Sequence, residues 1–220
     1  MHTFATPAPI TAVLEIPAGS VRFVAAARAD TTIEVLPADA RRSRDVKAAQ
    51  QTTVDYADGV LRIHADTKDQ YFGPTGSLQV TVHLPADSQV RATAGSAELH
   101  TTGRLGQVDF DGAYSQIHID EAAGLRLTAV DGDVAVSRLA GPAEITTARG
   151  DIRVAEAMRG TVVLRTQAGG ISIGAAAGVS ARLDADTSRG RISNALANNG
   201  TVELDIHATT AQGDITAHSL

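Results

Sequence analysis

The sequence predicts an all-β protein, a single-domain parallel β-solenoid whose coils of about 20 residues each contain two strands. Three observations predict this fold. A Gly-Asp-type phrase recurs along the second half of the chain, apolar and polar residues alternate after each recurrence, and no helix-length apolar periodicity separates the recurrences. A repeat of this size cannot bury its apolar face alone, so successive repeats must stack.

The first strand of each coil follows the recurring phrase, as in Gly132-Asp133-Val134 and Gly150-Asp151-Ile152. The first apolar residue of these strands forms a predicted inward column, which consists of Ala97, Ile117, Val134, Ile152, Ile171, Ile192 and Ile215. A second inward column lies two residues further on and consists of Leu99, Ile119, Val136, Val154 and Ile173, before Asn194 and Ala217 interrupt it. Columns that stay apolar through insertions indicate a specific register.

The second strand of each coil lies between successive phrases. Its predicted inward column consists of Phe110, Leu127, Ile145, Leu164, Leu183 and Leu204. Its predicted outward column consists of Asp109, Arg126, Glu144, Val163, Arg182 and Glu203. Opposite charges are neighbours along much of this outward column, which favours the register because like charges on adjacent strands repel.

Residues 1–94 are β-rich but less regular than residues 95–220, and we expect both parts to form one domain. Alternating strands are predicted at 13–16, 19–23, 32–35, 59–64 and 77–84. The segment Ala38–Gln51 has a helix-forming composition and predicts a short surface helix. The segment Thr67–Ser77 contains two glycines and a proline and predicts a loop.

The composition excludes several classes of protein. No cysteine is present, so neither a disulfide framework nor a thiolate metal site is possible. A net charge of -6 argues against a general nucleic-acid binder. No apolar run reaches the roughly 20 residues that span a bilayer, and the first residues lack the pattern of a signal peptide. We therefore expect a cytoplasmic protein without membrane insertion.

Two groups of outward residues on neighbouring predicted coils are candidate sites. In the first, Glu98 would lie beside His118 and His100 beside Asp120, a set that suits Zn²⁺ or acid–base chemistry. In the second, Asp184 and Asp186 would face Asp205 and His207, a set that suits a hard cation such as Ca²⁺. The alternative for both groups is a set of exposed ion pairs without a ligand, which also resembles a site. Apart from these possible ions we expect no cofactor.

Two further segments predict interactions. Tyr71 and Phe72 are two of the few aromatic residues, and they fall together in the predicted loop, where they either recognise a partner or cover the end of the stack. The last predicted strand contains Ile215 and Thr216 and would leave an unpaired edge. We therefore expect self-association through this C-terminal coil, most simply as a two-fold dimer.

Several segments resemble a bacterial family of β-strand-repeat proteins of unknown function known as "putative adhesins". Within that family, the soluble actinobacterial branch is the most similar. The segments that carry the resemblance are the Gly-Asp phrases, 45–49, 54–59, Leu84-Pro85-Ala86, 94–97, 103–106 and 188–194. The resemblance covers nearly the whole chain. It implies a stacked β architecture and supplies no catalytic residues.

No motif of a known enzyme class accompanies these repeats: the sequence lacks the phosphate-binding P-loop, the HExxH metal motif and the GxSxG nucleophile motif. We therefore expect a non-catalytic scaffold or protein-interaction module with an unidentified protein partner. A carbohydrate-binding or polysaccharide-acting protein that uses a carboxylate and histidine face is the alternative, and a surface adhesin is the third possibility.

Overall fold

The computed structural model describes residues 1–65, 76–114 and 116–220 of the chain. The fold is all-β, with 71% of residues in strands and 4% in helix, as the sequence predicts. Two compact units, Met1–Ser115 and Gln116–Leu220, are described separately below. The predicted change from irregular to regular strands near residue 94 falls inside a single strand, Gln89–Thr102, of the first unit.

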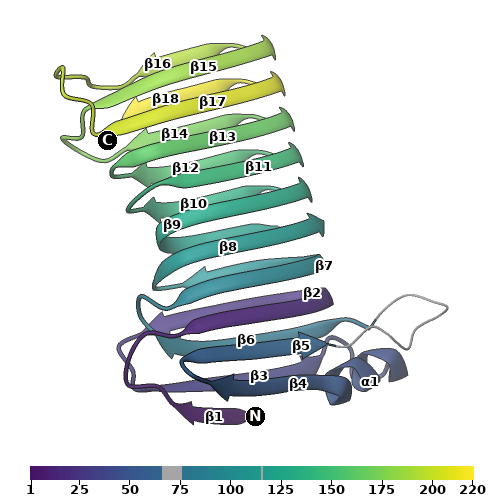
Figure 1. Ribbon diagram of the computed structural model, residues 1–220. Coiled ribbons are helices and arrows are strands. Elements are labelled where there is room, and N and C mark those ends of the chain that lie inside the picture. Colours follow the sequence, from purple (N-terminus) through teal and green to yellow (C-terminus); the bar gives the residue numbers. More distant parts are fainter. Residues whose placement is uncertain (66–75, 115) are drawn as a thin grey trace. The chain divides into compact units, whose positions relative to one another are not determined.

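Residues 1–65 and 76–114 of the first unit form eight strands and one helix (Figure 1). These are β1 (His2–Ala5), β2 (Thr11–Ala26), β3 (Asp30–Pro37), α1 (Ser43–Gln51), β4 (Thr52–Ala57), β5 (Val60–Ala65), β6 (Leu78–Pro85), β7 (Gln89–Thr102) and β8 (Arg104–Tyr114). The helix lies within the predicted segment 38–51, and the predicted strands of this half correspond to β2, β3, β5 and β6, with two of them beginning one residue early, at Gly59 and Ser77. The predicted loop at 67–77 lies mostly outside the described residues.

The long strand β2 organises the first unit. Its first half pairs in parallel with β5 and its second half with β6, while β7 pairs in parallel with both halves. The pairings β1–β3, β3–β6 and β4–β5 are antiparallel, so this unit departs from the purely parallel solenoid of the prediction. Helix α1 carries the buried Asp45, whose carboxylate accepts hydrogen bonds from the backbone N–H groups of Asp39 (3.2 Å) and Ser77 (3.1 Å).

The second unit contains ten strands (Figure 1). These are β9 (Ile117–Asp131), β10 (Val134–Leu139), β11 (Ala143–Arg149), β12 (Ile152–Ala157), β13 (Gly160–Ala168), β14 (Ile171–Ala175), β15 (Ala181–Arg189), β16 (Ile192–Ala195), β17 (Leu204–Gln212) and β18 (Ile215–Ser219). All pairings among them are parallel. They form a first face in the order β9–β10–β12–β14–β18–β16 and a second face in the order β9–β11–β13–β17–β15.

The order of strands in space differs from their order in the chain at the end of this unit. Strand β17 lies between β13 and β15, and β18 lies between β14 and β16 (Figure 1). The prediction that the last strand forms an unpaired edge is therefore wrong. The open edge is formed instead by β15 and β16. After β14 the chain leaves the next strand position of each face empty, and β17 and β18 later occupy these two positions.

The inward columns of the first face are confirmed within this unit. Val134 pairs with Ile117 and Ile152, and Ile171 pairs with Ile152 and Ile215. Ile192 pairs with Ile215 and so lies at the end of the column. On the second face the predicted column is wrong at its last positions, since Leu183 lies beside Ile206 and not beside Leu204. Alternation has a period of two, so a shift by two residues leaves the apolar pattern intact and goes undetected in the sequence.

The recurring Gly-Asp phrase has a direct structural cause in the close stacking of turns. Gly169 has a φ of +154°, and a Cβ there would lie 2.0 Å from the Gly150 carbonyl oxygen. Asp151 accepts a hydrogen bond at Oδ1 from the N–H of Gly170 in the next turn (2.8 Å), and Asp133 accepts one from the N–H of Asp151 (2.8 Å). Glycine thus permits the close approach, and aspartate satisfies the backbone donor of the neighbouring turn.

Candidate functional site

A shallow polar hollow of about 400 Å³ lies on the first unit, where β2, β6 and β7 run side by side. It is lined by Ser20, Val21, Arg22, Gln79, Val80, Thr81, Glu98 and His100. Strand alternation turns Val21 and Val80 inward, where they are buried. The polar residues between them point outward, so the same alternation that builds the core also lines the hollow.

Charged and hydrogen-bonding groups lie in register across this hollow. Arg22 is opposite His100 on β7 and opposite Thr81 on β6, while Ser20 is opposite Glu98. Arg22 is exposed, and within residues 1–65, 76–114 and 116–220 its guanidinium has no hydrogen bond or ion pair. A guanidinium provides five N–H donors that suit carboxylate and phosphate groups, and Glu98 and the neighbouring Gln79 can accept hydrogen bonds from hydroxyl groups. These groups match the hydrogen-bonding groups of a small polar ligand.

The first predicted metal group is divided between the two units. Glu98 and His100 lie on β7, whereas His118 and Asp120 lie on β9, where His118 is opposite Ala135. Because the units are described separately, the predicted proximity of Glu98 to His118 stays a prediction. Among the residues that the structure describes, no group of three or more His, Asp or Glu side chains has an arrangement that could hold a metal ion.

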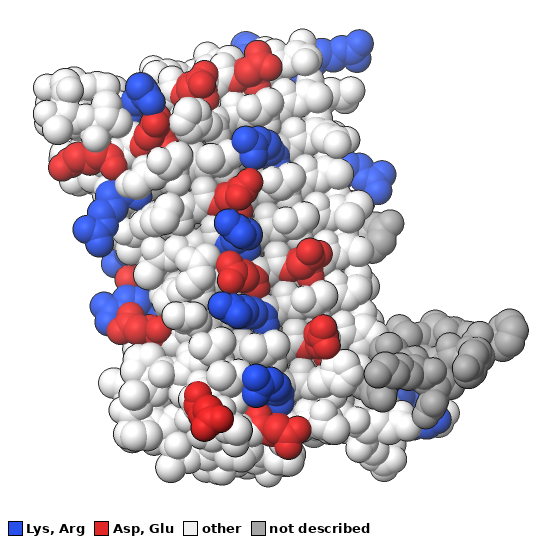
Figure 2. All heavy atoms as spheres, viewed as in Figure 1, with Lys and Arg blue, Asp and Glu red and all other residues white. Residues whose placement is uncertain are grey.

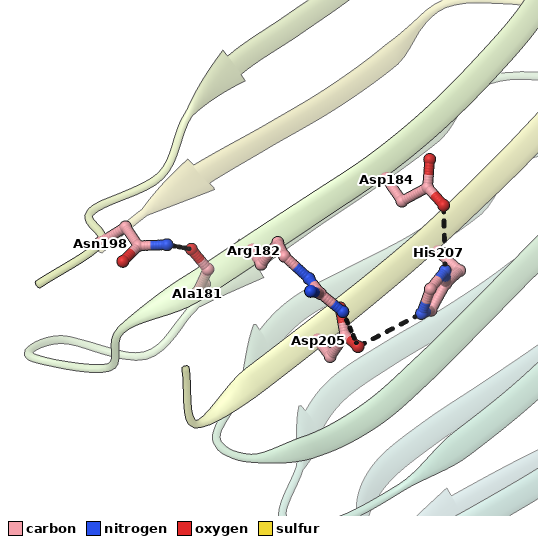
Figure 3. Close-up of polar contacts among 6 residues, drawn as sticks. All are labelled: Ala181, Arg182, Asp184, Asn198, Asp205 and His207. Carbon is pink, nitrogen blue, oxygen red and sulfur yellow. Dashed lines mark hydrogen bonds and ion pairs between the residues drawn. The ribbon is translucent and has the colours of Figure 1, made fainter. Parts of the chain in front are cut away.

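The second predicted group lies on β15 and β17 at the end of the second unit (Figure 3). The predicted neighbours are wrong by two residues, because Asp184 lies opposite His207 and Asp186 lies opposite Thr209. His207 contacts Asp184 through Nδ1 (3.4 Å) and Asp205 through Nε2 (3.3 Å).

Arg182 dominates the electrostatics of this second group. Its Nε and Nη2 donate hydrogen bonds to the two carboxylate oxygens of Asp205 at 3.0 and 2.6 Å (Figure 3). These bonds hold the pKa of the Asp205 carboxyl below its usual value. The guanidinium of Arg182 therefore lies beside Asp205, where the sequence predicts a bound cation. Binding of Ca²⁺ by this group stays a prediction.

The predicted interaction residues have different outcomes. Tyr71 and Phe72 lie outside the described residues. Ile215 and Thr216 lie on β18, which pairs with β14 on one side and with β16 on the other. The reason given for self-association through these two residues is therefore wrong, although association itself is not tested.

Sequence reasoning missed Arg22 and Gln79 as functional candidates. Each is one outward residue of an ordinary alternating strand, and no local motif marks it. They line the same hollow only because β2 pairs with two strands that follow it much later in the chain. Arg182 did carry a signal, since it belongs to the predicted outward column of alternating charges.

Together, the stacked coils, the two-residue Gly-Asp turns and the outward polar rows define a β-solenoid-like repeat protein with an open sheet. A family model described as "Toastrack DUF4097" matches residues 14–219, and the chain therefore belongs to the Toastrack family. This agrees with the resemblance noted from the sequence. Among curated proteins, none matches this chain.

Solved structures from two bacteria are similar to this chain. A "putative adhesin" from Bacteroides fragilis is 12% identical, with a TM-score of 0.57 over 98% of this chain and 95% of the other. A "putative adhesin" from Parabacteroides distasonis is 12% identical with a TM-score of 0.47, again over 98% and 95%. The first likeness shows a shared fold and nothing more. In the described part of the chain, no helix has the length and apolar composition needed to cross a membrane.

Proposed function

We propose that this protein is a non-catalytic scaffold that presents the outer side of its sheet faces to a protein partner. The observation that supports the proposal is the shortness of the turns along one edge of the second unit. The coils join through two-residue turns along one edge, such as Asp133 after Gly132 and Asp151 after Gly150. Such turns are too short to form walls around a substrate, which a catalytic cleft requires.

The outer side of the second face carries charge in a regular pattern. Glu144 forms ion pairs with Arg126 on β9 (3.9 Å) and with Arg165 on β13 (3.4 Å). Figure 2 shows acidic and basic side chains alternating along this face. Exposed ion pairs of this kind contribute little to the stability of the fold. We therefore assign their regular spacing to the recognition of a surface with complementary charges.

Site-specific photo-crosslinking in the host cell tests this proposal. A photoreactive residue replaces Val163, which lies opposite Glu144 on the second face, or Ala135 as a matched outward position on the first face. We expect a discrete protein adduct at Val163, most of which is lost when Glu144→Lys reverses the neighbouring charge. No discrete adduct from either position would contradict the proposal.

A second candidate function is the binding of a small polar ligand, such as a carbohydrate, and the hollow beside Arg22 favours it. The hollow contains guanidinium, amide, carboxylate and hydroxyl groups within one small volume. Binding of an acidic oligosaccharide panel is measured by calorimetry. We expect Arg22→Ala to weaken binding about ten-fold or more, as loss of a charged hydrogen bond predicts, whereas Arg126→Ala leaves it unchanged. Equal loss in both variants would argue against the hollow.

We further propose that the scaffold acts in the cytoplasm, and a surface adhesin is the alternative that the names of the similar structures suggest. Fractionation of the host cell separates these possibilities. A protein found with cytoplasmic markers supports the scaffold. Accessibility to protease added outside intact cells supports the adhesin.

A further inference from the structure

We propose that the open edge of β15 binds an extended basic segment of a partner protein, which adds to the second face as one more strand. This surface is the free edge of the second face, at the end of the second unit, and the proposal concerns the backbone groups of that edge. Binding by strand addition uses backbone hydrogen bonds for affinity and alternate side chains for specificity. Three features of the edge support it: unpaired backbone groups, an uncovered apolar interior and a row of acidic side chains.

The backbone groups of β15 that face away from β17 lack strand partners. At the start of the strand, the N–H of Ala181 donates to the Ala197 carbonyl (2.9 Å), and the Ala181 carbonyl accepts from the Asn198 side chain (3.1 Å; Figure 3). Hydrogen bonding alternates between the two sides of a strand, so Leu183 and Ala185 direct their groups the same way as Ala181. Within the described ranges no group of the protein pairs with them, and β15 pairs with β17 alone.

The apolar interior is also uncovered at this end. Leu183 and Ala185 are half-buried, whereas Ile206 and Ala208, their neighbours on β17, are buried. On the first face Ile192 is 47% exposed, whereas Ile215 beside it is fully buried. An added strand with small apolar residues at alternate positions would cover Leu183 and Ala185, and the hydrophobic effect favours that burial.

Charge identifies the occupant as basic. Asp184 and Asp186 point outward from the edge strand, and the side chain of Asp184 is 77% exposed. The only basic residue among the outward positions 182–186 is Arg182, and Asp205 already holds its guanidinium. Opposite charges on adjacent strands stabilise pairing and like charges oppose it. The edge therefore favours lysine or arginine at alternate positions of the added strand, in agreement with the chain's net charge of -6.

The same residues disfavour a second copy of this chain at the edge. Two-fold antiparallel pairing centred on Asp184 places this carboxylate against its own copy. Pairing centred on Ala185 places Asp184 against the second copy's Asp186. Pairing centred on Leu183 places the second copy's Ala185 against Ala181, whose backbone groups are already bonded to residues 197 and 198. Every two-fold arrangement near the middle of β15 thus meets either like charge or an occupied position.

Titration with a labelled probe peptide tests the inference. The probe is a short, capped peptide of alternating lysine and valine, and its acidic counterpart has glutamate in place of lysine. Fluorescence anisotropy at low salt should show saturable binding of the basic probe alone. The double variant Asp184→Asn/Asp186→Asn should bind it about five-fold more weakly, as the loss of two exposed charge pairs predicts. The matched control Asp109→Asn/Asp111→Asn removes two equally spaced acids from β8 and should bind as the wild type does.

A second variant separates the edge from general electrostatics. Ala185→Pro removes an N–H that faces away from β17, a position at which proline is tolerated in an edge strand. We expect it to keep the far-ultraviolet circular dichroism spectrum of the wild type and to lose probe binding. Unchanged binding in this variant would overturn the inference. So would a wild-type dimer in light scattering that Ala185→Pro disrupts, because a second copy would then occupy the edge. A failed titration beside discrete crosslinks at Val163 would overturn this inference and leave the proposed scaffold standing.

Discussion

Truncation of three isoleucines in one column measures the order of strands directly. Ile152, Ile192 and Ile215 occupy the same inward position of the first face on β12, β16 and β18. If the strands stacked in chain order, Ile192 would be interior and Ile215 would lie at the end. In the structure Ile215 and Ile152 are fully buried and Ile192 is 47% exposed. Replacement of each by alanine therefore distinguishes the two arrangements.

The expected magnitudes follow from burial. Ile152→Ala and Ile215→Ala remove a fully buried side chain and should each lower the free energy of unfolding by about 3–4 kcal/mol. Ile192→Ala removes a side chain that buries only half its surface at the open end, so the expected loss is about 1 kcal/mol. Urea denaturation followed by circular dichroism gives the values, provided that the slope with denaturant is unchanged. A loss for Ile192→Ala that equals or exceeds the loss for Ile215→Ala would refute the inserted position of β18.

Three other predictions concern the turns, the ion pairs and the metal group. Gly169→Ala should destabilise the second unit by about 3 kcal/mol or more in thermal melts, because the new Cβ would overlap the Gly150 carbonyl oxygen. The control Gly178→Ala has open space around its new Cβ and should lower stability less. Asp205→Asn should lower stability by at most about 1 kcal/mol at neutral pH. The folded pKa of Asp205 is depressed. The stability difference between the wild type and Asp205→Asn should therefore be lost as pH falls below about 3.9, the unfolded pKa, and then through the folded pKa. A constant stability difference down to strongly acidic pH would contradict this prediction. If Glu98, His100, His118 and Asp120 bind Zn²⁺, excess zinc should raise the melting temperature of the wild type but not of His118→Ala, and no rise in the wild type would exclude the site.

The sequence predicts the repeating parts of this fold well because their pattern is local. Each Gly-Asp turn and the alternation after it report which residues point inward, and the first-face column from Ile117 to Ile215 has the predicted members. One local signal was overlooked: Asp58-Gly59, both with positive φ, joins β4 to β5 as a two-residue hairpin. The Asp-Gly pair is the usual residue choice for such a turn, so this hairpin was predictable.

The parts that sequence reasoning missed are those that local pattern does not encode. Leu183 fits equally well beside Leu204 or Ile206, because both are apolar residues of the same parity on β17. The position of β17 between β13 and β15 depends on the path of the connections at 176–180 and 196–203. The hollow beside Arg22 depends in the same way on pairing between β2 and strands that follow it by tens of residues. Candidate sites built from long-range pairing therefore required the structure.

The inserted position of β17 and β18 constrains how the second unit can be made during synthesis. The ribosome releases β15 and β16 before the strands that must lie between them and β13 and β14 exist. Until residues 204–219 emerge, β13 is the exposed edge strand of the second face, so β15 can pair with it, and both strands present matching alternation. Such a pairing would have to open again to admit β17, a barrier that a strictly sequential solenoid does not meet. Nascent chains arrested before residue 204 should therefore hold β15 in a protease-resistant but non-native pairing, and the speed of the last folding step should depend on how readily that pairing dissolves.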